Sequence, residues 1–129
     1  MTISQWFSFQ GRLRRRHFWL LYVLPLIVAH AAATALDATL GFITLKDIAP
    51  EDGYGVAAYG MGPFMIVVGL VNLWAGLAAQ VKRWHDRDKS GWWVLIALVP
   101  LIGQIWALVV VGFLAGTPGP NRFGPDPRV

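Results

Sequence analysis

The sequence predicts an all-α membrane protein, a small bundle of about three transmembrane helices. Its residues are 56% hydrophobic and only 14% charged, whereas soluble domains average about 25% charged residues. Three uncharged stretches are also long enough to span a bilayer, whose core of about 30 Å needs roughly 20 apolar residues. At 129 residues, the chain fits a single integral membrane domain. No stretch alternates with period two, and a closed barrel needs many more segments, so strands are not expected.

The predicted spans cover about residues 18–36, 61–80 and 92–115. Pro25 should kink the first span, and its small residues after Val28 also fit a cleaved signal peptide, an alternative that two further spans argue against. Pro100 and Gly103 could break the third span or turn it into a re-entrant hairpin. At 24 residues, which is about 36 Å of helix, one crossing fits better than two.

The basic residues predict the orientation of the chain. They gather in the N-terminal arm and in the second loop, whereas the first loop is acidic. Loops rich in Lys and Arg are retained in the cytoplasm. The arm and the second loop are therefore predicted to be cytoplasmic, and the chain is predicted to be a multi-pass membrane protein with a cytoplasmic N-terminus. Three simple crossings would then put the tail outside. The basic residues expected to face anionic lipid are Arg14, Arg16, Lys82, Arg87 and Lys89.

The partner class follows from the same charges. The net charge of +4 lies next to apolar runs, which favours a membrane surface over nucleic acid. The chain has no cysteine, so disulfides and thiolate metal sites are excluded, and neither a metal nor a cofactor is expected.

The second loop reads KRWHDRDKSGWW from residue 82 to 93. A hinge explains most of it: Lys82 and Arg83 suit a helix C-terminus, carboxylates and Ser90 suit the next N-terminus, and the tryptophans suit the headgroup layer. His85 alone has no role in such a hinge. The stretch is therefore either an anchored turn or part of a functional site.

Three stretches of the chain resemble one protein family. They are FQGRLRRRHFW (9–19), RWHDRDKSGWW (83–93) and AGTPGPNRFGPDP (115–127), and in this order they are similar to domain of unknown function 805, a family of small bacterial inner-membrane proteins. The resemblance implies a bacterial inner-membrane location and no defined activity. It also favours a folded Gly/Pro-rich cap at the C-terminus over a disordered tail, since a disordered tail has no need of Phe123.

We hypothesise that the arm, the hinge and the tail form one polar cluster at the cytoplasmic surface. This arrangement needs all three on one face of the membrane and conflicts with three simple crossings. The residues assigned to the cluster are Arg12, Arg15, Arg83, His85, Asp86, Ser90 and Asn121.

Polar residues and glycines also occur within the spans. The intramembrane polar residues are His30, at helical spacing from Thr34 and Asp37, and Asn72. Such groups are either functional or simply hydrogen-bonded across the bundle. Gly62, Gly69 and Gly76 recur every seven residues and predict a packing seam.

Three classes of function remain open. The favoured class is a non-enzymatic scaffold or complex component that binds anionic headgroups and pairs with itself or with another membrane protein. The second is a small transporter or channel that uses His30 and the glycine-lined second helix. The third is an interfacial enzyme with His85 as acid or base oriented by Asp86. No catalytic residue is assigned, because the sequence lacks the GxxxxGK, HExxH and GxSxG patterns.

Overall fold

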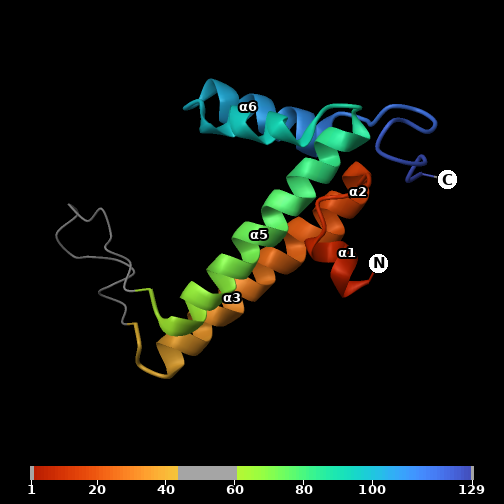
Figure 1. Cartoon of the computed structure of the whole chain (residues 1–129). Helices are drawn as coiled ribbons and strands as arrows, with labels where there is room; N and C mark the ends of the chain where they lie inside the picture. Colours follow the sequence, from red (N-terminus) through yellow and green to blue (C-terminus); the bar gives the residue numbers. More distant parts are fainter. Residues whose placement is uncertain (1, 44–60, 129) are drawn as a thin grey trace. The chain divides into compact units, whose positions relative to one another are not determined.

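The computed structural model describes residues 2–43 and 61–128, and the regular secondary structure of these residues is helical, with one isolated β-bridge between Asn121 and Gly124 (Figure 1). They form two compact units. One contains residues 26–73, and the other contains residues 1–25 together with residues 74–129. The acidic first loop falls largely outside the described residues.

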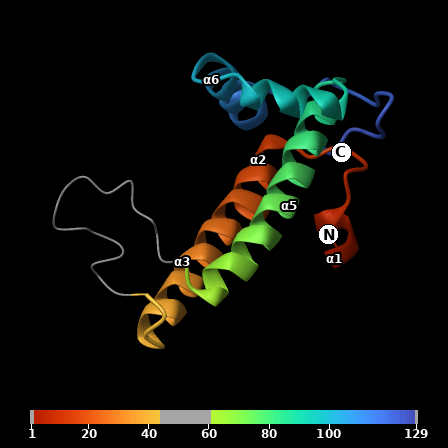
Figure 2. The ribbon, with the colours of Figure 1, turned by 60° about the vertical axis from the view of Figure 1, so that its left-hand side comes forward.

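The unit of residues 26–73 is a pair of antiparallel helices. It contains most of α3 (Leu24–Thr39) and the first half of α5 (Pro63–Asp86), which lie side by side in Figures 1 and 2. The side-chain amide of Asn72 donates to the carbonyl of Leu26 at 3.0 Å. At the other end, the Asp37 carboxylate accepts from the backbone N–H groups of Phe64 at 3.2 Å and Met65 at 2.8 Å.

Asp37 thus caps the N-terminus of α5. Its side chain is fully buried, and the free N–H groups and the positive end of the helix dipole stabilise its negative charge. Gly62 makes the approach feasible, because a Cβ at this position would overlap the Asp37 carboxylate. A buried carboxylate in an apolar helix is therefore accounted for by a structural role.

Two continuous helical stretches are long and apolar enough to cross a membrane, namely Arg15–Thr39 with 25 residues and Pro63–Asp86 with 24 residues. The first joins α2 (Arg15–His17), η1 (Phe18–Val23) and α3. η1 is a π-helix that ends two residues before Pro25. A proline lacks an N–H group and clashes with the preceding turn, so the wider π turn falls where that conflict arises. Leucine and valine side chains project outward from both stretches, as expected for helices that contact lipid.

The third apolar segment is a helical hairpin. Its arms are the 3₁₀-helix η2 (Gly91–Leu98) and the pair α6 (Ile102–Leu108) and η3 (Val109–Phe113), as Figure 2 shows. A Cβ at Gly103 would overlap the carbonyl oxygen of Ile96, so the arms touch at this glycine. The break expected as an alternative at Pro100 and Gly103 is therefore present, and the preference for one continuous helix was wrong.

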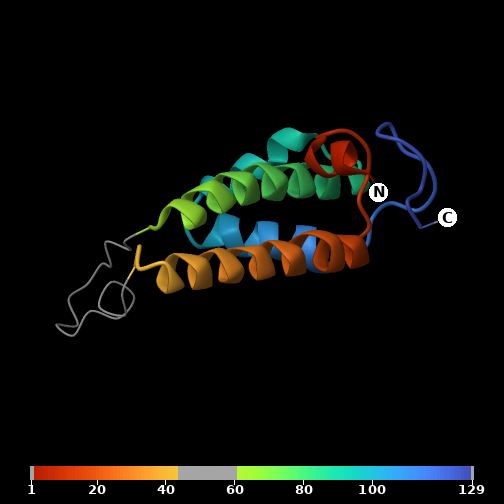
Figure 3. The same cartoon turned by 90° about the horizontal axis from the view of Figure 1, so that it is seen from below.

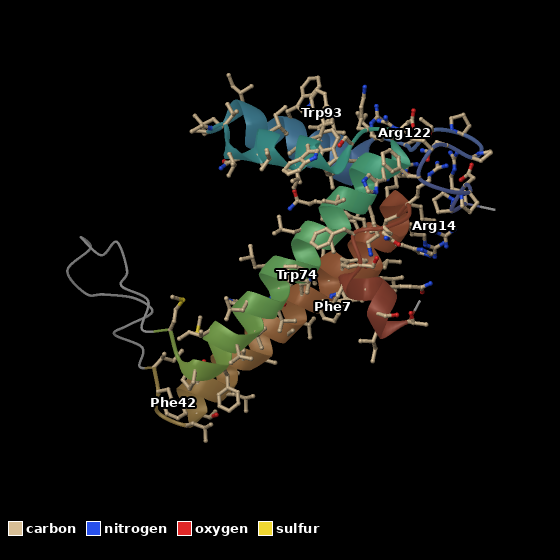
Figure 4. All side chains as sticks on the ribbon, in the orientation of Figure 1. Phe7, Arg14, Phe42, Trp74, Trp93 and Arg122 are labelled. Atoms are coloured by element: carbon tan, nitrogen blue, oxygen red, sulfur yellow. The ribbon has the colours of Figure 1, made fainter. Side chains whose placement is uncertain are left out.

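The short helix α1 (Ile3–Phe7) is fastened by its last carbonyl groups. A capping box between Thr2 and Gln5 begins the helix. The carbonyls of Gln5, Trp6 and Phe7 accept from Lys82 Nζ at 2.7 Å, Tyr22 Oη at 3.0 Å and Trp74 Nε1 at 3.1 Å, respectively; Figure 4 labels Trp74 and Phe7. These donors satisfy carbonyls that a five-residue helix leaves unpaired.

Candidate functional site

The centre of the site is the Asp86 carboxylate, which lies between two buried guanidinium groups. Arg12 Nη2 is 3.0 Å from one carboxylate oxygen and Arg83 Nη1 is 2.7 Å from the other. The two arginine side chains are 1% and 0% exposed. Two cations around one anion leave an excess positive charge, which the surrounding carbonyl dipoles must offset.

Arg83 fixes the hinge to the arm and to η3. Its Nε donates to the carbonyl of Val111 at 2.6 Å, and its Nη2 donates to the carbonyl of Leu114 at 2.7 Å. Nη1 donates to the carbonyl of Leu13 at 3.0 Å as well as to Asp86. The planar donor fork of arginine allows one side chain to hold three backbone carbonyls from two separate segments.

Arg12 fixes the arm to the tail. Its Nη1 donates to the carbonyl of Gly119 at 2.6 Å and its Nη2 to the carbonyl of Thr117 at 2.7 Å. Its Nε donates to Asp86 Oδ1 at 3.1 Å. We call Arg12, Arg83 and Asp86, with the carbonyls that they bind, the arginine clamp.

The tail is folded against the hinge, which confirms the predicted C-terminal cap. The backbone N–H of Thr117 donates to the carbonyl of Asp86 at 2.8 Å. Asn121 Nδ2 donates to the carbonyl of His85 at 2.9 Å and to Thr117 Oγ1 at 3.0 Å. A Cβ at Gly116 would overlap the Asp86 carboxylate. Figure 3 shows the tail at the same end of its unit as α1.

Asp126 stabilises the far part of the cap. Its carboxylate accepts from the guanidinium of Arg128 at 2.7 Å and from the backbone N–H of Gly119 at 2.9 Å. The hydrogen bonds from the Arg128 side chain and backbone, and then that from Gly119, hold the pKa of Asp126 well below its usual range. Gly119, at φ +72°, adopts the left-handed conformation that glycine tolerates best.

His85 stacks on the tail and does not pair with Asp86. Its ring lies parallel to that of Phe123, with centroids 3.9 Å apart and planes at 5°. Its Nδ1 is 3.1 Å from the carbonyl of Gly11, and because a carbonyl only accepts, this nitrogen carries the proton. The proposed orientation of His85 by Asp86 was therefore wrong, since the carboxylate is taken by arginines.

The clamp, together with the part of the hinge and tail beside it, brings together five of the seven residues assigned to the cluster. They are Arg12, Arg83, His85, Asp86 and Asn121. Arg15 lies at its edge, where it donates to the carbonyl of Phe113 at 3.1 Å. Ser90 lies outside it, because its hydroxyl caps η2 by accepting from the N–H of Trp92 at 3.4 Å.

The structure corrects the assignment of Lys82 to the lipid-facing set. Lys82 is only 4% exposed, and it donates to Tyr22 Oη at 2.6 Å and to the carbonyl of Gln5. Lys82 is buried because α1 packs over it and binds its ammonium group through the carbonyl of Gln5. Arg16 and Lys89 are exposed, and Arg14 and Arg87 are partly exposed. Trp84 is likewise buried and is stacked on Trp93, with ring centroids 5.8 Å apart.

The intramembrane polar residues are not connected to the clamp by any hydrogen bond among the described residues. The side chain of Asn72 is bonded to the carbonyl of Leu26, and His30 is exposed. Of the three glycines in the predicted seam, Gly62 alone contacts another helix among the described residues, at Asp37 of α3. A Cβ at Gly69 or Gly76 would meet no atom of the described chain within 4 Å.

Sequence reasoning missed two contributors to this region. The Thr117 carbonyl accepts from Arg12 of the clamp and its hydroxyl accepts from Asn121, and the Tyr22 hydroxyl accepts from the ammonium group of Lys82. Two sequence signals could have indicated these residues. Thr117 is a hydroxyl residue in a Gly/Pro-rich tail, and Tyr22 is a tyrosine inside an apolar span. Both side chains have polar tips that need partners when they are buried.

The fold and the clamp define a small all-α membrane protein whose two chain ends and interhelical hinge are joined by buried arginines. A sequence model of the family described as protein of unknown function, DUF805, matches residues 6–125, and the chain belongs to that family. The resemblance stated from the three motifs is thereby confirmed.

Three relatives from Escherichia coli K12 cover nearly the whole chain. Inner membrane protein YhaH is 34% identical over 129 residues, covering 99% of this chain and 93% of the relative. Inner membrane protein YhaI is 32% identical over 128 residues, covering 98% and 92%, respectively. Uncharacterized protein YiiR is 30% identical over 151 residues, covering 98% and 90%. No solved structure matches.

Proposed function

We propose that this protein is a non-enzymatic component of the bacterial inner membrane, a scaffold or a subunit of a larger complex, held by its basic cytoplasmic face against anionic lipid. The observation that carries the proposal is the division of its charges into two sets. Arg12, Arg83 and Asp86 are buried and bound to one another. Most other basic side chains of the arm, hinge and tail are exposed and have few carboxylates near them.

The clamp also supports a topology. Arg12 of the arm bonds the hinge carboxylate and the tail carbonyls directly, so the three segments occupy one side of the membrane. Two spanning helices and a hairpin that returns to its starting side give an even number of crossings. Both termini are then cytoplasmic, in agreement with the positive charge of the arm and the hinge. This topology removes the conflict created by three simple crossings.

The geometry argues for a structural role of the clamp. The guanidinium nitrogens of Arg12 and Arg83 already donate to Asp86 and to backbone carbonyls, so they are not available to polarise a substrate. Asp86 accepts from both arginines, and His85 is stacked on Phe123. A general acid or base must reach the proton that it transfers, and these groups are held by the fold itself.

Cysteine accessibility tests the topology, because the natural chain contains no cysteine. We expect Lys89→Cys and Pro125→Cys to be protected from a membrane-impermeant maleimide in spheroplasts and Asp52→Cys to be labelled. Permeabilised cells should expose all three, which shows that each thiol is reactive. Labelling of Pro125→Cys in sealed spheroplasts would place the tail outside and overturn the topology.

Lipid-dependent stability tests the binding of anionic headgroups. Phosphatidylglycerol added to the protein in uncharged detergent should raise the melting temperature more than the same mole fraction of phosphatidylcholine. The difference should shrink in 0.5 M salt, because screening weakens attraction between exposed charges. Equal shifts with the two lipids would contradict a basic face that binds anionic lipid.

A further inference from the structure

A small basic pocket opens between the arm and the start of the tail. Its volume is about 200 Å³, and its charged lining is Arg14, Arg15, Arg16, Arg128 and Asp86. Ala115 and Gly116 complete the wall. Figure 4 labels Arg14 beside the tail.

The pocket has a large excess of positive charge. Asp86 is its one acidic lining residue, and the clamp arginines Arg12 and Arg83 already bind both of its oxygens. Arg128 is paired with Asp126 at 2.7 Å. The charges of Arg14, Arg15 and Arg16 have no carboxylate partner among the described residues. Three neighbouring arginines repel one another, and an anion between them relieves that repulsion.

Several arginine donors in the pocket are also unused. Arg14 Nε is buried and has no hydrogen-bond partner in the described part of the chain. Arg14 Nη2 contacts His17 Nε2, and Arg15 Nη1 donates to the carbonyl of Phe113, so these two side chains are held in place. The guanidinium of Arg16 makes no hydrogen bond within residues 2–43 and 61–128. A buried donor without a partner is unfavourable, whereas the exposed guanidinium of Arg16 is free to donate to an acceptor in the pocket.

An apolar groove begins where the basic pocket ends. Arg15 and Arg16 line both, and the groove of about 460 Å³ continues over Trp19, Leu20, Gly112 and Phe113. Leu20 and Phe113 are 48% and 58% exposed. The ligand best suited to such a site has an anionic head and an apolar body joined to it.

We propose that this pocket binds the phosphate of a phospholipid headgroup, with Arg14, Arg15 and Arg16 as its donors and with an acyl chain lying in the groove of Trp19, Leu20 and Phe113. The inference rests on the proposed affinity for anionic lipid and assigns it to one site. Guanidinium groups bind phosphate oxygens through paired, charge-assisted hydrogen bonds. Basic pockets beside cytoplasmic helix ends are suited to lipid headgroups.

The test compares two double variants with equal loss of charge. Arg14→Gln/Arg16→Gln removes donors from the pocket, and Arg87→Gln/Lys89→Gln removes two basic side chains that do not line it. Native mass spectrometry in uncharged detergent measures the dissociation constant of the first bound phosphatidylglycerol. We expect the pocket variant to bind it at least about tenfold more weakly than the control variant does.

Two outcomes separate this inference from the proposed function. If both double variants lose affinity equally, lipid binding is delocalised over the basic face, the pocket is overturned and the proposed function stands. If neither the natural chain nor the variants prefer phosphatidylglycerol to phosphatidylcholine, the pocket assignment and the proposed function are both wrong. Melting curves must show that the two variants are folded. If the pocket double variant is unfolded, the single variant Arg16→Gln replaces it in the binding measurement. Arg16 makes no hydrogen bond within the described chain, so this change should leave the fold intact.

Soluble glycerol 1-phosphate distinguishes a lipid from a free phosphate ester. It carries the same phosphate without the acyl chains. We expect it to bind at least about a hundredfold more weakly than phosphatidylglycerol, because the apolar groove then stays empty. Equal affinity would show that the groove contributes nothing and would overturn the assignment to a lipid.

Discussion

Arg12 and Asp86 lie 74 residues apart in the sequence, and their side chains are 3.0 Å apart in a buried ion pair. Arg83 completes the arrangement from the other side of the carboxylate. The energetic consequence is asymmetric. Loss of the single anion leaves two buried cations without a counterion, whereas a surface pair would be replaced by water.

Asp86→Asn should therefore lower the free energy of unfolding by roughly 3–5 kcal/mol, because it keeps the shape of the side chain and removes its charge. The control is Asp88→Asn, which breaks the exposed pair with Arg122 and should cost less than about 1 kcal/mol. Denaturant titration in detergent, followed by tryptophan fluorescence, measures both. Similar losses for the two variants would mean that the clamp has no special energetic role.

The stack of His85 on Phe123 should be visible as energetic coupling. We expect a double-mutant cycle of His85→Ala and Phe123→Ala to give a coupling energy of about 0.5–1.5 kcal/mol. Asn121 offers a matched comparison, because it bonds the backbone carbonyl of residue 85 and not the ring. The cycle of His85→Ala with Asn121→Ala should be closer to additive, and the reverse order of the two couplings would contradict the stacked geometry.

Gly62, just before α5, and Gly69, within it, should respond in opposite directions to replacement by alanine. Gly62→Ala places a methyl group on the Asp37 carboxylate and should destabilise the protein by displacing the cap of α5, at roughly 1–3 kcal/mol. Gly69→Ala meets no atom of the described chain and should stabilise the helix by up to about 1 kcal/mol. Thermal melts in detergent provide the comparison. A loss of stability in Gly69→Ala would restore the packing seam, between chains instead of within one.

The turn of the hairpin stores backbone strain at Leu101. The N–H of Ile102 donates to the carbonyl of Pro100 at 2.8 Å around Leu101 at φ 60° and ψ −71°, which is a γ-turn of the strained kind. Leu101→Gly should therefore raise stability by about 1 kcal/mol. The control Leu98→Gly, in the preceding arm, should lower it by up to about 1 kcal/mol. Equal destabilisation by the two changes would show that the turn is not strained.

The sequence predicted the helical class and the membrane setting, because long apolar runs are local signals. The meeting of arm, hinge and tail was hypothesised from three polar motifs that resemble those of one family. The sequence could not predict how each charge is used. Lys82 and Arg83 are neighbours in one basic run, yet Lys82 fastens α1 whereas Arg83 binds Asp86. Both side chains turn inward, and each binds partners more than 25 residues away.

The third apolar segment, residues 92–115, also shows that local sequence does not determine long-range contacts. Pro100 and Gly103 marked a place where the helix could break, but segment length favoured one crossing. The outcome depended on contact between the arms, where Gly103 lies against the carbonyl of Ile96. Local composition carries no information about that contact.

The reach of Arg12 has a consequence for biosynthesis. Two of its acceptors, the carbonyls of Thr117 and Gly119, lie 105 and 107 residues further along the chain. A ribosome that has delivered both long apolar helices has therefore not yet supplied two of the acceptors that the Arg12 side chain needs. The arm lacks these acceptors until residues 117 and 119 have been translated. Closure of the arm by Arg12 is thus a late step in the synthesis of this stretch of the chain.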